Sequence, residues 1–220
     1  MERQPTEPGQ PRDADQLVRD LLAQGSESLV DYKAAMSVPT DAPGRASLAK
    51  DVIGWSNCKD GGYLLIGVDD KTHDPAGLSE AQVATWDAAD LTSSLSAFAA
   101  PPPVVQVFRG SLPDGTILVA VRVVPFQDQP LVCIKSVDHR GHSVTRSGAL
   151  YIRAPGTQTK EITTEAEMRE LLGRAYVTRA DRLLSEIKAL IDAHWPGGVT
   201  SPADDLLALI DRDLSSMELP

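Results

Sequence analysis

The sequence contains little cysteine and no long hydrophobic run. Its 220 residues include two cysteines, Cys58 and Cys133, which are too few for a disulfide framework. The longest apolar runs, "YLLIGV" and "TILVAV", are far shorter than the roughly 20 residues that span a bilayer. No stretch combines a basic start, an apolar core and a small-residue cleavage site. We therefore expect a cytoplasmic, reduced location and no membrane segment.

Several familiar motifs for nucleotide binding and hydrolysis are also missing. There is no "GxxxxGK" followed by Ser or Thr, and "GGYLLIG" comes before a strand instead of after one. The motifs "GxSxG" and "HExxH" do not occur either. These absences argue against ATP or NAD binding through a P-loop or a dinucleotide fingerprint, and against a serine hydrolase of the elbow type.

The charge distribution is more informative than the net charge. A net charge of −10 argues at first against nucleic acid, because phosphate binding draws on Lys and Arg. Most of the acidity lies near the two ends, however, and the segment 130–160 has a local balance of +4. We expect its basic residues, which face only Asp138, to contact nucleic acid: Lys135, Arg140, Arg146, Arg153 and Lys160. The alternative is an ordinary solvated face of a sheet.

The first half of the chain alternates helical and extended patterns. Residues 1–13 are polar and proline-rich, which predicts disorder. A domain is predicted over 14–173 and a helical extension over 174–220. Within the domain, the elements are predicted from capping residues, apolar spacing and turn residues. The predicted helices run from Asp13 or Asp15 to Gly25, from a cap at Asp41, and over 79–99 with a cap at Ser79. The predicted strands are 29–33 and a buried strand in "NCKDGGYLLIGVDD".

The second half changes its periodicity. Short β-branched runs separated by turn residues, such as "VVQVFRG", "TILVAVRVV" and "ALYIRA", predict a mainly antiparallel sheet. From Thr164 the pattern is helical again, and "PGG" at 196–198 separates a last helix at 202–217. The predicted class is α/β in the α+β sense: a mixed, largely antiparallel sheet with flanking helices and a C-terminal helical extension. The surplus helices predict an oligomer or partner contact, unless they pack back on the domain.

An ordered set of short motifs resembles one known family. The segments are "ESLVDYK", a helix ending in "WSNCKDGGYLLIGVDD", "VPFQDQPLV" and "LYIRAPGTQTKEITTEAEMREL". Together they resemble the Schlafen AlbA-like (AlbA_2) domain, over roughly residues 20–173. That family combines Glu-Ser near a Glu-Phe-Lys strand, a Gly-Gly-x-(apolar)-Gly-x-x-Asp strand and a late Tyr-x-Arg-x-Gly.

The resemblance implies a nucleic-acid-binding domain, with RNA favoured over DNA. Some Schlafen proteins are metal-dependent endoribonucleases that act on structured RNA such as tRNA. Carried over by position, the implied catalytic residues are Glu27, Asp31, Lys33 and Asp70, and the implied ligands of Mg²⁺, Mn²⁺ or Zn²⁺ are Glu27, Asp31, Asp69 and Asp70. Because AlbA-like lobes can pair in this family, we also expect a homodimer.

Two departures from the family pattern leave the activity open. Asp31 is one methylene shorter than the family Glu, and Glu27 lies four residues before it instead of five, with Ser26 at the aligned position. Asp31 and Lys33 still share a strand face, where a carboxylate could hold a cation and an ammonium could meet a phosphate. The alternatives are therefore an endoribonuclease, a non-catalytic nucleic-acid or nucleotide-binding module, and an oligomerising interaction protein. Asp69 and Asp70 could also be only a strand-ending turn.

Overall fold

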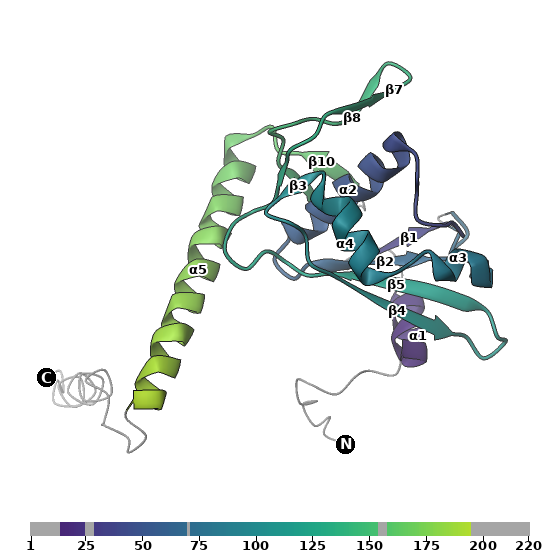
Figure 1. Ribbon diagram of the computed structural model, residues 1–220, viewed down its shortest axis with the longest axis horizontal. Helices are drawn as coiled ribbons and strands as arrows, with labels where there is room; N and C mark the ends of the chain where they lie inside the picture. Colours follow the sequence, from purple (N-terminus) through teal and green to yellow (C-terminus); the bar gives the residue numbers. More distant parts are fainter. Residues whose placement is uncertain (1–13, 25–28, 70, 154–157, 195–220) are drawn as a thin grey trace, which may run out of the picture. The chain divides into compact units, whose positions relative to one another are not determined.

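The computed structural model describes residues 14–24, 29–69, 71–153 and 158–194 (Figure 1). The expected disorder at 1–13 and the expected helix at 202–217 lie outside these residues. The chain divides into two units, Met1–Tyr176 and Val177–Pro220. The helices are α1 (Ala14–Gln24), α2 (Ala42–Ser56), α3 (Glu80–Ala84), α4 (Ala88–Ser96) and α5 (Glu165–His194).

A four-stranded sheet forms the centre of the first unit. Its strand order is β1-β2-β5-β4, built from β1 (Val30–Lys33), β2 (Gly62–Ile66), β5 (Ile117–Val123) and β4 (Val105–Ser111). β1 and β2 are parallel, whereas β5 is antiparallel to both of its neighbours. Three antiparallel pairs accompany it: β3 (Ala99–Ala100) with β6 (Val132–Cys133), β7 (Val137–His139) with β8 (His142–Thr145), and β9 (Tyr151–Arg153) with β10 (Thr159–Glu161). The predicted mixed, largely antiparallel sheet with flanking helices is confirmed.

The two faces of the sheet are covered by different helices. Successive side chains of a strand point to opposite faces. On β2, Leu64 and Ile66 join one buried cluster with residues of α2 and α4, whereas Leu65 joins another with residues of α1. Figure 1 shows α1 on one side of the sheet and α2 and α4 on the other. The same alternation on β1 sends Val30 and Tyr32 to the α1 side.

A third apolar cluster ties the late strands to the first turns of α5. Leu171 is fully buried there, together with Ile53 of α2 and Tyr151 of β9. The predicted helix after Thr164 is therefore confirmed, and it runs for 30 residues. Among the described residues, no helix is both long enough and apolar enough to cross a bilayer.

Two glycines at the start of β2 allow close contacts, Gly61 with the end of β5 and Gly62 with α2. Gly61 has a positive φ of 63°, and a Cβ there would lie 2.2 Å from the Val123 carbonyl oxygen. A Cβ on Gly62 would lie 2.2 Å from the Trp55 ring, so no larger residue fits without displacing that side chain. The tight turn and close backbone approach expected of this pair are both present.

The prediction of a single helix at 79–99 is wrong, because the structure has two helices, α3 and α4, in this segment. Asp41 and Ser79 cap their helices as expected, the latter in a capping box with Gln82. However, α3 ends at Ala84 and α4 begins at Ala88. Asp87 starts the second helix by accepting hydrogen bonds from the amides of Ala89 and Asp90. The break lets Trp86 point into the core, where its side chain is fully buried.

Candidate functional site

Strand β1 places Asp31 and Lys33 on the face of the sheet that α2 covers. Their neighbours Val30 and Tyr32 occupy the α1 side, so the two-residue period of the strand directs the two charged side chains the other way. The Lys33 ammonium lies 3.0 Å from the Asp31 carboxylate. The prediction that these two side chains share a face is confirmed.

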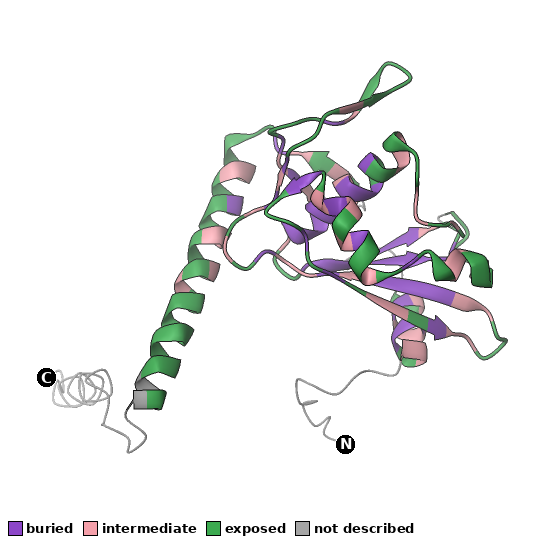
Figure 2. Ribbon diagram, in the orientation of Figure 1, coloured by how far each residue is buried: buried purple, intermediate pink, exposed green. Residues whose placement is uncertain are grey.

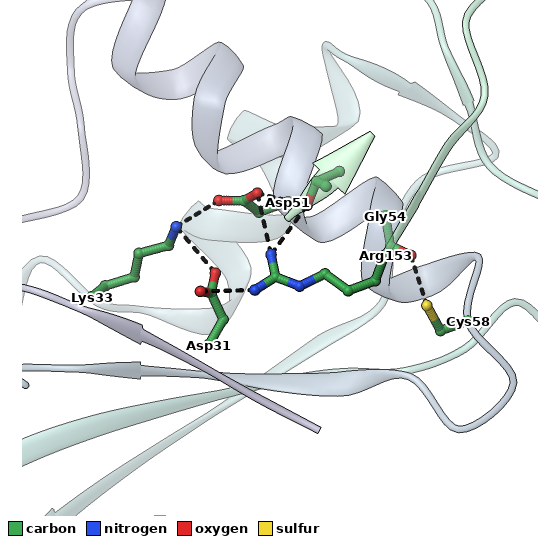
Figure 3. Close-up of polar contacts among 7 residues, drawn as sticks. Asp31, Lys33, Asp51, Gly54, Cys58 and Arg153 are labelled. Atoms are coloured by element: carbon green, nitrogen blue, oxygen red, sulfur yellow. Dashed lines mark hydrogen bonds and ion pairs between the residues drawn. The ribbon is translucent and has the colours of Figure 1, made fainter. Parts of the chain in front are cut away.

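Helix α2 and strand β9 each add one charged residue to this pair. Asp51 of α2 lies 2.7 Å from the Lys33 ammonium. Arg153 of β9 lies 2.8 Å from Asp31 and 3.7 Å from Asp51. We call Asp31, Lys33, Asp51 and Arg153 the charge cluster; Figure 3 shows its two carboxylates between its two cations. With two negative and two positive groups, the charge cluster is neutral.

Arg153 is the most enclosed member of the charge cluster. Its side chain is only 6% exposed, and the guanidinium lies 4.9 Å from the centre of the Trp55 ring. One nitrogen donates to the Thr159 hydroxyl, which itself donates to Asp51 at 2.8 Å. Its Nε and Nη2 atoms make no hydrogen bond with the described residues. That side of the guanidinium is therefore stabilised by its ion pair with Asp31.

The two carboxylates determine the protonation of Lys33. Burial lowers the pKa of Lys33, but the facing charges of Asp51 and Asp31 outweigh burial and raise it above its usual value of 10.5. Lys33 therefore stays charged at physiological pH, and its ammonium is held by the carboxylates.

This shift predicts a stability effect at alkaline pH. Because the folded-state pKa is raised, the stabilisation from Lys33 is complete below pH 10.5 and is lost as the pH rises through the folded-state value. The difference in unfolding free energy between the natural chain and Lys33→Met should therefore shrink above that pH. Urea unfolding from about pH 8 to about pH 11.5 measures it. A difference that grows with pH would contradict the assignment.

A polar pocket opens beside the charge cluster. Its volume is about 420 Å³. Besides all four members of the charge cluster, it is lined by Tyr32, Ala34, Ser47, Gln158 and Thr159. A pocket of this size could admit a phosphate or a sugar-phosphate unit, with the partly exposed Lys33 as the nearest accessible cation.

The described acidic residues do not fit a divalent metal ion. Asp31 is already paired with two cations. Asp69 is exposed, and its carboxylate accepts the amides of Lys71 and Thr72 in the turn after β2, which lowers its pKa. Over the described parts of the chain, no three His, Cys, Asp or Glu side chains converge as metal ligands would. The other two proposed ligands, Glu27 and Asp70, lie outside the described residues.

The five basic residues expected to contact nucleic acid lie in different environments. Arg146 pairs with Glu161 and Lys160 pairs with Glu167, so each of these two positive charges is neutralised by a glutamate. Arg153 is buried in the charge cluster. Lys135 lies over the Phe98 ring, and Arg140 lies at the exposed turn of the β7–β8 hairpin.

Two residues of this region were not predicted from the sequence. Asp51 is the only acidic residue within α2, among the buried Leu48, Ala49, Val52 and Ile53, and such an isolated charge signals a buried partner. Asn57 ends α2 and is fully buried. The segment "WSN" belongs to the family pattern, but the sequence does not show which groups the Asn57 side chain binds.

Comparison with known proteins identifies the family. The sequence profile of the family described as "Schlafen, AlbA_2" matches residues 27–162, which is more than half of the chain. The protein therefore belongs to the Schlafen AlbA_2 family, as its motifs predicted. No curated protein matches the sequence.

Two solved structures are similar at low identity. The DIP2311 protein from Corynebacterium diphtheriae is 20% identical with a TM-score of 0.42, and the match covers 66% of this chain and 25% of that one. The N-terminal domain of an ATP-dependent DNA helicase RecG-related protein from Nitrosomonas europaea is 23% identical, also with a TM-score of 0.42, and the match covers 70% of this chain and 96% of that one. The chain thus spans about a quarter of the DIP2311 protein.

Proposed function

We propose that this protein is a nucleic-acid-binding module that holds its ligand without cleaving it. Membership of the AlbA_2 family supports nucleic-acid binding. The observation that favours binding over cleavage is the state of the carboxylates: Asp31 and Asp51 are both occupied by Lys33 and Arg153. A carboxylate that neutralises a buried arginine is not available to a metal ion at the same time.

The ligand surface that we propose centres on two basic residues, Arg45 and Arg140, which have no carboxylate partner among the described residues. Arg45 is exposed on α2, and Arg140 is exposed on the β7–β8 hairpin, against whose strands α2 packs. In Figure 1 this hairpin extends away from the sheet. Phosphate contacts of this kind depend on salt and place a backbone without reading its sequence.

The hairpin turn supports a role for Arg140 in particular. Arg140 and Gly141 have φ values of 50° and 78°, both positive, as a two-residue type I′ turn requires. Asn and Gly are the usual residues there, and a larger side chain in this conformation costs about 1–2 kcal/mol. The strain and exposure of this arginine favour a role in binding over a role in the fold.

Arg140→Asn should therefore separate binding from stability. The asparagine keeps the turn and removes the charge, so the affinity for a labelled RNA hairpin should fall while the unfolding midpoint stays equal or rises. Fluorescence anisotropy at several salt concentrations measures the affinity. The salt slope should become shallower by roughly 0.7–0.9 for each phosphate that the variant no longer neutralises.

A matched control lies on the opposite side of the sheet. Arg19→Gln removes one positive charge from α1, which covers the other face, and should leave the affinity unchanged. Equal losses in both variants would mean that only net charge matters, and no loss in Arg140→Asn would remove the hairpin from the ligand surface. Replacing the RNA by a DNA duplex of equal length tests the preference for RNA.

Metal-dependent cleavage of structured RNA such as tRNA is the second proposal. It is favoured by one observation: β1 and β2 are parallel, so the strand that carries Asp31 and the strand that precedes Asp69 and Asp70 end at the same edge. Cleavage would require Asp31 to exchange Arg153 or Lys33 for a metal ion, with Glu27 and Asp70 as further ligands. Incubation of tRNA with Mg²⁺, Mn²⁺ or Zn²⁺ tests it: cleavage that Asp70→Asn abolishes would replace the first proposal with this one.

A further inference from the structure

The second half of α5 carries a regular apolar stripe. Apolar side chains recur at Tyr176, Ala180, Leu183, Ile187 and Leu190, with alternating spacings of four and three residues. This is the seam of a heptad repeat, in which these residues occupy the a and d positions. Val177 and Leu184 occupy the neighbouring e positions and widen the stripe on one side.

Apart from the half-buried Ala180, these side chains are exposed, in contrast to the start of the same helix. Leu171 is fully buried, whereas Leu184 is 65% exposed and Leu190 is 61% exposed. Figure 2 shows the change from mixed burial to a nearly continuous exposed surface along α5. Single exposed apolar residues are ordinary, but a stripe that continues over more than two helical turns marks an interaction surface. In proteins, most of the stability of an amphipathic helix comes from the packing of its apolar face.

The charges beside the stripe indicate what covers it. Arg179 and Glu186 occupy successive g positions and carry opposite charges, and Glu186 also pairs at 2.8 Å with Arg182, one turn earlier on the same helix. In an antiparallel pair of identical helices, g positions face each other, so Arg179 of each helix meets Glu186 of the second copy. The e positions also face each other, which places apolar Val177 and Leu184 against apolar residues. A parallel pair would instead place each charged g position against an apolar e position.

We propose that the segment Tyr176–His194 of α5 pairs antiparallel with the same segment of a second copy, which makes the protein a homodimer. The pairing has two-fold symmetry and closes on itself, so it produces a dimer and not a filament. It goes beyond nucleic-acid binding and does not depend on it, although two copies of the proposed ligand surface would then share one assembly.

Mass measurement of the full chain tests the pairing. Light scattering across micromolar concentrations should give about twice the chain mass of 23.6 kDa. Leu183→Glu places a charge in the seam and should give single chains, whereas Ser185→Glu, on the opposite side of the helix, should stay dimeric. A single-chain mass for the natural protein, a mass above two chains, or equal dissociation by both variants would overturn the proposal.

Charge exchange tests the orientation and guards against a variant that merely misfolds. Arg179→Glu alone and Glu186→Arg alone each create two like-charge contacts, so each should weaken the dimer by about fivefold or more. The double variant Arg179→Glu, Glu186→Arg restores opposite charges between the copies and should form a tighter dimer than either single variant, although the Arg182–Glu186 pair within each helix stays lost. A double variant as weak as the two single ones would rule out the antiparallel arrangement.

Discussion

Asp31→Asn is expected to lower the free energy of unfolding by about 3 kcal/mol, because removing one partner of a buried ion pair leaves the other charge uncompensated. The charge left behind is the Arg153 guanidinium, whose side chain is 6% exposed and whose closest carboxylate is Asp31 at 2.8 Å. Asp51 at 3.7 Å and the Trp55 ring remain and limit the loss. Urea unfolding followed by circular dichroism measures the change.

Two further variants separate the ion pair from a general effect of substitution. Asp138→Asn removes a carboxylate from the exposed β7 strand and should change the unfolding free energy by less than about 0.5 kcal/mol. In Asp31→Asn, Arg153→Met both partners of the close pair are gone, and Lys33 keeps Asp51. The double variant should therefore be more stable than the sum of the two single losses predicts. Strict additivity would mean that Asp31 and Arg153 do not interact energetically.

The same ion pair affects how any activity assay of Asp31 is interpreted. The family resemblance implies that Asp31 is a metal ligand. Loss of cleavage in Asp31→Asn would therefore be interpreted as loss of that ligand. Because the same change leaves a buried charge unpaired, activity could also fall through unfolding. Loss of cleavage in Asp70→Asn would indicate a lost ligand only if the unfolding midpoint of that variant is unchanged.

The local structure near Asp31 could be predicted because its signals lie close together in the sequence. The two-residue period of "LVDYK" sends Asp31 and Lys33 to one face, and the Gly61–Gly62 pair marks a close approach of two segments. Caps at Asp41 and Ser79 follow from the side chains that can accept a helix-terminal amide. Each of these signals needs only the few residues around it.

The partners of the charged residues could not be predicted in the same way. Asp31 and Arg153 lie far apart in the sequence, and only the packing of β9 against α2 brings them together. The local balance of +4 at 130–160 suggested a basic surface, yet Arg146 and Lys160 pair with Glu161 and Glu167, which lie just beyond that window. A charge count along the chain does not show which charges neutralise each other in space.

Asn57→Ala is expected to be at least as damaging as Asp31→Asn, although it removes no charge. Asn57 is the only asparagine in the chain and is fully buried. Its amide nitrogen donates to the carbonyls of Leu131 and Tyr151, both at 2.9 Å, and its oxygen accepts the Leu131 amide at 2.8 Å. One side chain therefore joins the end of α2 to the segment before β6 and to β9.

The expected loss follows from the three backbone groups that alanine would leave without a partner. Each unsatisfied buried group costs about 1–3 kcal/mol, so the free energy of unfolding should fall by at least about 3 kcal/mol. Asn57→Asp keeps an acceptor for the Leu131 amide but loses both donors and places a negative charge against two carbonyl oxygens, so it should be no more stable than Asn57→Ala. Gln127→Ala removes an exposed amide that donates to the Pro125 carbonyl and should cost less than about 0.5 kcal/mol.

Hydrogen exchange shows where the damage falls. Because β9 carries both Tyr151 and Arg153, loss of the Asn57 bonds should reduce amide protection in β9 and β10 more than in β2 and β5, which the central sheet holds independently. The charge cluster would then lose the fixed position of Arg153 even in chains that remain folded. If Asn57→Ala and Gln127→Ala cost the same, or if protection falls equally in all four strands, Asn57 does not anchor the strand that completes the charge cluster.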